Sequence, residues 1–272
     1  MHGEAARRMG ERLAFIKRQP ARVLEWRSWL GASDAVLRER CPRAERIVVE
    51  EIARESAPWW SPRRWAGGPA AMAPAAVPAG SADLLWANMA LHFEADVEGL
   101  LRRWRPLIAT DGFLMFSTLG PGSLDALREL YRDAGWGPAL APLVDMHDLG
   151  DMLVHAAFAE PVMDQEQLVL TWPDAGAALA ELRGLGGNAA PDRFSGLRTP
   201  RWRERLRAAL NERRGADGRV RLTLELVYGH AFCPATRPRV APQTHIPVEQ
   251  LRSLARAGRA EPPTAKDPGG VG

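Results

Sequence analysis

Cysteine is scarce in this sequence, with only Cys41 and Cys233 among 272 residues. The two lie far apart, and the sequence has neither a Cys-x-x-Cys pair nor a cluster of histidines at metal-binding spacing. These absences exclude a disulfide framework and a zinc site, so we expect no metal. Because reduced cysteines are typical of intracellular proteins, we predict a cytoplasmic location.

Lysine is equally rare, since Lys17 and Lys266 are the only two. The formal net charge of +3 is therefore carried almost wholly by arginine, a composition typical of GC-rich coding. No basic run is interleaved with aromatic residues as in a groove that binds a nucleic-acid strand. We expect no nucleic-acid partner.

Long apolar runs are also missing from the sequence. The first 20 residues carry a charge every few positions and lack the apolar core of a signal peptide. No stretch reaches the ~18 uncharged apolar residues that a membrane span requires, so we expect no membrane association. With 46% hydrophobic and 25% charged residues, the composition is that of a globular protein with one main core.

Segments with strand and helix patterns alternate along the chain. Strands are predicted at 21–26, 46–51, 82–91, 111–120, 161–172 and 219–232. Helices are predicted at 8–17, 33–41, 95–108, 123–135, 146–158, 175–186 and 199–214. Strands separated by helices of about 10–15 residues indicate an α/β fold with a doubly wound, mostly parallel sheet. Ligands of such folds bind at the carboxyl ends of the strands.

Local signals refine several of these elements. Ser33 or Ser28 is expected to cap the second helix, and the helix at 123–135 should begin at a Ser123 cap and end at Gly135. The β-branched run at 46–51 predicts a strand buried on both faces. The Pro-, Gly- and Ala-rich segment 61–82 predicts a loop with at most a weak strand near 70–72.

Several stretches taken together resemble one enzyme family. They are ERLAFIKRQPARVLE, ADLLWANMALHF, LRRWRPLIATDGFLMFSTLGPGSLDALREL, VDMHDLGDMLVHAAFAEPVMDQEQLVLTW, LRGLGGNAA and LTLELVYGHAF. The chain is similar, from about residue 11 to about residue 252, to the malonyl-acyl-carrier-protein O-methyltransferases of biotin synthesis, which are class I enzymes dependent on S-adenosylmethionine.

The resemblance implies a seven-stranded Rossmann-like sheet in a single domain, 1–258, with a small helical insertion on the substrate side at 173–215. Residues 259–272 should form a disordered tail. The implied reaction moves a methyl group from S-adenosylmethionine to the free carboxyl of a malonyl group on acyl carrier protein. Because a carboxylate is already a competent nucleophile, catalysis rests on alignment and desolvation, and no catalytic side chain is expected.

Four residues match the cofactor-binding positions of the family. Glu25 stands at the end of the first strand, Gly31 at the last glycine of the loop after it, and Asn88 near the end of the segment 82–91. Glu50, with Glu51 as the neighbouring alternative, matches the acid that holds the ribose hydroxyls. Glu25 could instead cap a neighbouring helix, and Asn88 could instead be a turn residue that closes its strand.

The chain departs from the family pattern in its glycine-rich loop. Arg27 and Trp29 occupy the places of two glycines, where the backbone must take a positive φ and approach the ligand closely. No acidic residue between Arg64 and Ala82 matches the acid expected near the adenine. The family also begins some twenty residues earlier with a segment that covers the site, so either the start was placed late or this lid has been lost.

The resemblance points to six residues on the substrate side. They are His147, Arg183, Asn188, Arg193, Tyr228 and His230. An arginine there could hold the malonyl carboxylate through two hydrogen bonds, although many arginines of this chain are expected on its surface. Tyr228 and His230 lie on one face of a strand, either lining a pocket or packed against each other. His92 and Phe93 replace a polar and an aromatic residue of the family and could line the pocket.

The acidic carrier protein implies a complementary basic surface, which either 102–105 or 200–207 could supply. Two other functions stay open at this point. The altered loop is also compatible with an inactive methyltransferase fold that serves as a binding or regulatory module. A methyltransferase that acts on another small carboxylate or on a protein is a third possibility.

Overall fold

The computed structural model describes residues 1–30, 32–50, 71–184 and 188–235, which belong to one compact unit, Met1–Ala235. Its centre is a seven-stranded sheet in the order β3-β2-β1-β4-β5-β7-β6, parallel except for β7, which runs antiparallel to both neighbours. The strands are β1 Arg22–Trp26, β2 Glu45–Val49, β3 Ala71–Met72, β4 Ala82–Ala87, β5 Ile108–Leu119, β6 Ala159–Trp172 and β7 Val220–Phe232.

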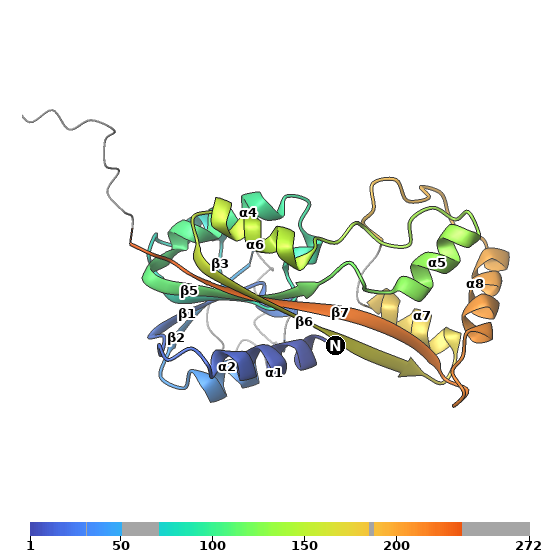
Figure 1. Cartoon of the computed structure of the whole chain (residues 1–272), viewed down its shortest axis with the longest axis horizontal. Coiled ribbons are helices and arrows are strands. Elements are labelled where there is room, and N and C mark those ends of the chain that lie inside the picture. Colours follow the sequence, from blue (N-terminus) through green and yellow to red (C-terminus); the bar gives the residue numbers. More distant parts are fainter. Residues whose placement is uncertain (31, 51–70, 185–187, 236–272) are drawn as a thin grey trace, which may run out of the picture. The chain divides into compact units, whose positions relative to one another are not determined.

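Helices cover both faces of the sheet (Figure 1). The helices are α1 His2–Leu13, α2 Asp34–Arg40, α4 Val97–Trp104, α5 Asp125–Asp133, α6 Met146–His155, α7 Ala175–Gly184 and α8 Pro200–Glu212. Short 3-10 turns lie at Ser28–Leu30, Pro74–Ala76, Leu91–Phe93 and Arg105–Leu107. This arrangement confirms the predicted doubly wound α/β fold.

Two apolar clusters join these layers. On one face, Met9 of α1 and Leu37 of α2 pack against strand residues such as Trp86. On the other face, side chains of α4 and α6, including Trp104 and Leu153, pack against a second set of strand residues. The central strands are buried on both faces because helices cover both, as the parallel arrangement requires.

A third cluster lies at the far end of the long β6–β7 pair, which extends beyond the other strands (Figure 1). There α5, α7 and α8 pack together against the paired ends Trp172 and Val220. The helices α7 and α8 fall within the predicted insertion 173–215, and α5 joins them from outside it. The predicted domain end at 258 and the tail 259–272 lie outside the described residues.

Four local predictions change in the structure. Ser123 does not cap α5, because its hydroxyl donates to the carbonyl of Glu225 and accepts from the same residue's amide, at 3.1 and 3.0 Å. Ser33 precedes α2 without capping it, since its hydroxyl accepts from the Trp86 indole at 2.9 Å. Ser28 does not cap α2 either, because it begins a separate 3-10 turn.

Strand β2 is buried only near its carboxyl end, contrary to the expectation of burial throughout. The two-residue strand β3 pairs only with Val48 and Val49, so the start of β2 has no neighbour on that side among the described strands. Other predictions hold: the weak strand near 70–72 is present as β3, and Gly135 follows the last turn of α5 with a φ of +64°.

Candidate functional site

Two buried acids lie at the carboxyl ends of β1 and β2, where the sequence placed them. The Glu25 side chain is almost fully buried, and Arg46 of β2 donates to its carboxylate at 2.5 Å. Arg46 also forms an ion pair with Asp34 at the start of α2. Burial raises the pKa of Glu25 above its ordinary value, although Arg46 acts in the opposite direction. Glu25 thus ties β1 to β2 and, through Arg46, to α2.

Glu50, immediately after β2, holds the loop that follows β1. One of its carboxylate oxygens accepts a hydrogen bond from the Ser28 hydroxyl at 3.2 Å and one from the Trp29 amide at 3.4 Å. This carboxylate therefore lies beside the loop, as an acid that binds ribose hydroxyls must. The neighbouring alternative, Glu51, and the loop glycine, Gly31, lie outside the described residues.

Arg27 retains the backbone conformation of the glycine that it replaces. Its φ is +51°, in the left-handed region that glycine adopts most readily. Its guanidinium forms an ion pair with Glu94 and donates to the carbonyl of Ala90 at 3.3 Å, so the side chain spans from the loop after β1 to the turn after β4. The side chains of Arg27 and Glu94 are both largely buried.

The side chain of Trp29, the second large residue in this loop, is directed toward solvent. The residue is 56% exposed, so its indole does not pack into the interface between the sheet and the helices. Trp29 is also absent from the lining of the cavity described below. The loop thus keeps one glycine-like backbone position and directs its second bulky side chain toward solvent.

Asn88 joins three elements at the carboxyl end of β4. Its side-chain amide donates to the carbonyl of His2 at 3.1 Å, and its oxygen accepts from the Ser117 hydroxyl of β5 at 2.7 Å. The same hydroxyl accepts from the Met89 amide at 3.0 Å. Asn88 therefore fastens the first turn of α1 over the ends of β4 and β5.

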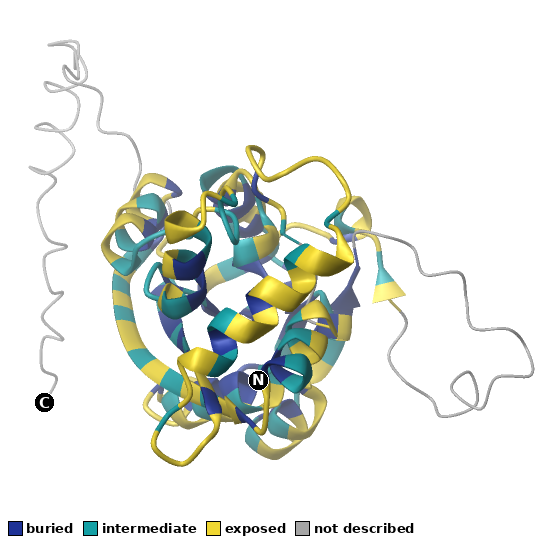
Figure 2. Cartoon of the chain, turned by 90° about the vertical axis from the view of Figure 1, so that its right-hand side faces the viewer, coloured by how far each residue is buried: buried dark blue, intermediate teal, exposed yellow. Residues whose placement is uncertain are grey.

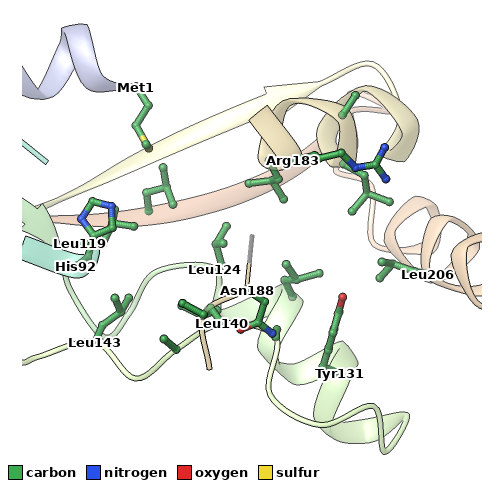
Figure 3. Close-up of a pocket in the computed structure, with 18 of the residues that line it drawn as sticks. Met1, His92, Leu119, Leu124, Tyr131, Leu140, Leu143, Arg183, Asn188 and Leu206 are labelled. Carbon is green, nitrogen blue, oxygen red and sulfur yellow. The ribbon is translucent and has the colours of Figure 1, made fainter. Parts of the chain in front are cut away.

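A cavity of about 420 Å³ begins beside this point (Figure 3). Its walls come from the start of α1, the turn after β4, the end of β5, the loop 139–143, and the helices α5, α7 and α8. In Figure 3, His92, Leu119 and Met1 stand at one end, and Arg183 and Leu206 stand at the other. The cavity thus runs from the carboxyl edge of the sheet to the third apolar cluster, and most of its lining side chains are apolar.

His92, which lines the cavity together with His2, is a titratable side chain at its inner end. Its Nδ1 lies 3.5 Å from the Thr118 hydroxyl, and its ring stacks at 4.2 Å on Phe93, which also lines the cavity. Burial lowers the pKa of His92 to about 4, with smaller contributions from His2 and Arg27. The imidazole is therefore neutral at physiological pH.

Of the six substrate-side residues, the structure places two at the cavity. Arg183 and Asn188 both line it. The Asn188 amide donates to the Pro138 carbonyl at 2.8 Å, and its oxygen accepts from the Ala190 amide at 2.9 Å, so it also holds two loops together.

Two of the six lie on exposed surface instead. The His147 side chain lies on the first turn of α6, 79% exposed, with Nδ1 2.7 Å from an oxygen of Asp145. Arg193 donates to the Ala190 carbonyl at 3.1 Å in an exposed loop. Neither belongs to the lining of the cavity. His147 and Arg193 therefore contact only neighbouring residues of their own segments in the hydrogen bonds given above.

Tyr228 and His230 share one face of β7, as alternation predicts, but that face is turned toward α1. Arg12 of α1 lies over the Tyr228 ring at 3.9 Å. Burial, followed by the nearby Glu166 carboxylate, raises the pKa of Tyr228, and burial lowers the pKa of His230. Neither side chain lines this cavity, so their positions favour the alternative that the pair is packed within the fold.

Sequence reasoning placed α8 in a substrate-side insertion without naming its cavity residues, and it missed the contribution of α5. Tyr131, Trp202, Arg203, Leu206 and Arg207 all line the cavity. Their apolar spacing predicts amphipathic helices, but nothing in that spacing says which ligand the buried face meets. Among the described residues, no group of three or more metal-ligating side chains could hold an ion, and no helix in this part of the chain is long and apolar enough to cross a membrane.

The chain is similar to proteins of known name over most of its length. It is 37% identical over 249 residues to the malonyl-[acyl-carrier protein] O-methyltransferase of Laribacter hongkongensis, covering 87% of this chain and 84% of the relative. It is 38% identical over 248 residues to the protein of the same name in Gallionella capsiferriformans, with 86% and 84% covered. No family model matches the chain.

Solved structures share the fold at low sequence identity. The YcgJ protein of Bacillus subtilis superimposes with a TM-score of 0.54 at 12% identity, covering 84% of this chain and 98% of that one. A candidate methyltransferase of Bacillus halodurans superimposes with a TM-score of 0.53 at 10% identity, covering 85% and 100%. At these identities the likeness concerns the fold alone.

Proposed function

Because this chain belongs to the malonyl-[acyl-carrier protein] O-methyltransferase family, we propose that it methylates the free carboxyl of a malonyl group carried by acyl carrier protein. The methyl donor is S-adenosylmethionine, and the product is the malonyl methyl ester that enters biotin synthesis. We place this reaction in the cytoplasm. The observation that supports it best is the apolar cavity that starts at the carboxyl ends of β4 and β5.

The residues at the ends of β1, β2 and β4 suit S-adenosylmethionine. Glu50 lies where a carboxylate can accept bonds from ribose hydroxyls, and the loop beside it has the positive φ of a glycine at Arg27. The Arg27 side chain is held toward Glu94. We propose Glu25, Gly31, Glu50 and Asn88 as the cofactor-binding residues. When bound, S-adenosylmethionine supplies a methyl group on a positively charged sulfur.

The cavity favours the transfer through its polarity. The acceptor carboxylate loses its negative charge as its oxygen forms a bond to the methyl carbon, while the sulfur loses its positive charge as its bond to that carbon breaks. A reaction in which opposite charges disappear is favoured where water is excluded. Leu119, Leu143 and the neutral His92 line the inner end of the cavity, beside Met1 and His2, and exclude water there.

The outer part of the cavity suits the long arm that joins a malonyl group to its carrier. Its apolar walls from α5, α7 and α8 can surround a flexible thioester-linked chain. Arg183 and Asn188 remain our candidates for polar contacts to that arm. The positions of His147, Arg193, Tyr228 and His230 do not support direct contact with it. The inactive module considered above has no observation in its favour, since Arg27 preserves the loop backbone.

The proposal is tested by incubating the purified chain with S-adenosylmethionine carrying a labelled methyl group and with malonyl-acyl carrier protein. The expected result is label on the malonyl group as an ester that mild base removes. Acetyl-acyl carrier protein, which has no free carboxyl, is the matched control and should remain unlabelled. Binding of S-adenosylhomocysteine without any transfer to the malonyl substrate would instead indicate a different acceptor.

A further inference from the structure

One face of α8 forms part of the cavity wall and of its rim. Trp202, Arg203, Leu206 and Arg207 are spaced so that they share a side of the helix, and all four line the cavity. Leu206 is buried, whereas Arg203 and Arg207 are exposed. The two guanidinium groups therefore stand where the cavity meets solvent, together with the exposed Arg183 at the end of α7.

This rim carries positive charge that the protein does not neutralise. Helix α8 contains four arginines and only two glutamates. Within the described ranges, Arg183, Arg203 and Arg207 form no ion pair. Figure 2 looks onto this end of the molecule, where much of the helical surface is exposed. Isolated cations on an exposed rim are available to an anionic partner.

The other arginine-rich segment, 102–105, is engaged within the protein. Arg102 pairs with Glu98 at 2.5 Å, and Arg103 lies 3.8 Å from Glu94. Arg105 donates to the carbonyls of Ala157 and Pro234 at 2.9 and 3.0 Å. Of the two basic segments that the sequence offered for a carrier protein, the structure therefore favours the one in α8.

We propose that Arg183, Arg203 and Arg207 form the docking surface for the acidic carrier protein, whose acyl arm enters the cavity at this rim and extends inward to His92. This proposal rests on the proposed function. It adds where the carrier protein binds and which charged residues bind it. Complementary charge at a rim accelerates association and fixes orientation, with little effect on the chemistry at the inner end.

The test compares two acceptors and two double variants. The acceptors are malonyl-acyl carrier protein and a short malonyl thioester that has neither protein nor phosphate. The test variant is Arg203→Gln/Arg207→Gln. The matched control is Arg38→Gln/Arg102→Gln, which removes two exposed arginines that each pair with an acid one turn away on their own helix, far from the cavity lining.

We expect the KM for malonyl-acyl carrier protein to rise roughly four- to twenty-five-fold in the test variant, because each of the two exposed ion pairs accounts for a factor of about two to five. The kcat with that substrate and all constants with the short thioester should stay within about twofold. The control variant should match the wild type with both acceptors. Circular dichroism and S-adenosylhomocysteine binding establish that both variants are folded.

Three results would overturn the docking proposal. The first is an unchanged KM for the carrier substrate in the test variant, and the second is an equal rise in the control. The third uses malonyl-coenzyme A, which has phosphates and no protein: an equal rise in its KM would assign these arginines to a phosphate of the arm. Absence of methyl transfer by the wild type with every acceptor would contradict the proposed function itself.

Discussion

At the scale of single residues, Arg27 explains how a loop can lose a glycine and keep its shape. An arginine at a φ of +51° is strained relative to glycine by about 1–2 kcal/mol. Its largely buried ion pair with Glu94 offsets this cost, since each charge would otherwise be left without its partner in a poorly solvated place. The residue at position 27 is therefore coupled to Glu94, which follows the neighbouring strand β4.

The substitution Arg27→Gly tests this coupling. We expect a loss of about 1–3 kcal/mol in the free energy of unfolding, because the carboxylate of Glu94 loses its nearer partner and keeps Arg103 at 3.8 Å, while backbone strain is relieved. Adding Glu94→Gln should recover much of the loss. Affinity for S-adenosylhomocysteine should not fall in either variant, because glycine adopts the same φ. Urea unfolding and calorimetry provide the two measurements, and a gain in stability for Arg27→Gly alone would refute the coupling.

Glu25 gives a second residue-scale prediction, in which stability depends on pH. Its folded-state pKa is raised by burial, so the stability that it contributes is fully present below its ordinary pKa of 4.5 and is lost as the pH rises through the folded value. Glu25→Gln removes this titration. The free energy of unfolding of the variant, relative to the wild type, should therefore increase between pH 5 and pH 9.

Asp34→Asn is the matched control for that series. Asp34 shares Arg46 with Glu25, but hydrogen bonding to Arg46 lowers the pKa of Asp34 from 3.8. The stability that Asp34 contributes is therefore lost only at more acidic pH. The difference in the free energy of unfolding between Asp34→Asn and the wild type should be constant from pH 5 to pH 9. If the free energy of unfolding of Glu25→Gln also differed from the wild type by a constant amount, the effect of Arg46 on the pKa of Glu25 would outweigh that of burial.

The family resemblance placed Glu25 and Glu50 at the carboxyl ends of two strands, and the structure has both acids there. Chain direction brings such residues together, because the carboxyl ends of parallel strands meet at one edge of the sheet. Tyr228 and His230 follow from alternation, which says that two side chains share a face and leaves open which face meets the ligand. In the structure, α1 packs over the face of β7 that carries Tyr228.

At the scale of elements, α5 and α8 are joined by an aromatic cluster. Tyr131, Trp136 and Trp202 form three edge contacts, with ring centroids 5.4 to 6.0 Å apart. Arg198 lies over Trp202, and Arg205 lies over Trp136. Because Tyr131 and Trp202 also line the cavity, the contacts that hold these helices together also set the width of the proposed channel.

Trp202→Ala should separate the two roles of this cluster. We expect a loss of about 2 kcal/mol in the free energy of unfolding, because half-buried aromatic contacts and part of a cavity wall are removed. The KM for both malonyl acceptors should rise, whereas affinity for S-adenosylhomocysteine should not change. The neighbouring Arg201→Ala, an exposed residue outside the cavity lining, is the control and should change neither quantity. If Trp202→Ala also lost affinity for S-adenosylhomocysteine, its higher KM values would result from a change in the overall fold and not from the cavity wall.

At the scale of the whole molecule, the cavity joins segments that are distant in the sequence. Residues from 1–2, 92–93, 119–143, 176–183 and 188–207 line it because β7 turns back antiparallel and, with β6, carries α7 and α8 beyond the edge of the core. The alternation of strands and helices predicted the layers of the fold, but this long hairpin and the helices at its end meet only through tertiary packing. A sequence pattern does not specify such distant contacts, so α8 was predicted as a helix of a substrate-side insertion while its cavity-lining residues were not identified.

The separation between a charged rim and an apolar interior leads to a prediction about ionic strength. The Debye length falls from about 30 Å at 0.01 M salt to about 8 Å at 0.15 M, so salt screens attraction between exposed charges far more than contacts inside the cavity. The KM for malonyl-acyl carrier protein should therefore rise several-fold over this range, while the KM for the short malonyl thioester stays nearly constant. Arg203→Gln/Arg207→Gln should show a shallower dependence than the wild type. If salt raised both KM values in parallel, its effect would lie at the inner end of the cavity or on the cofactor, and recognition of the carrier would not depend on the charges of α8.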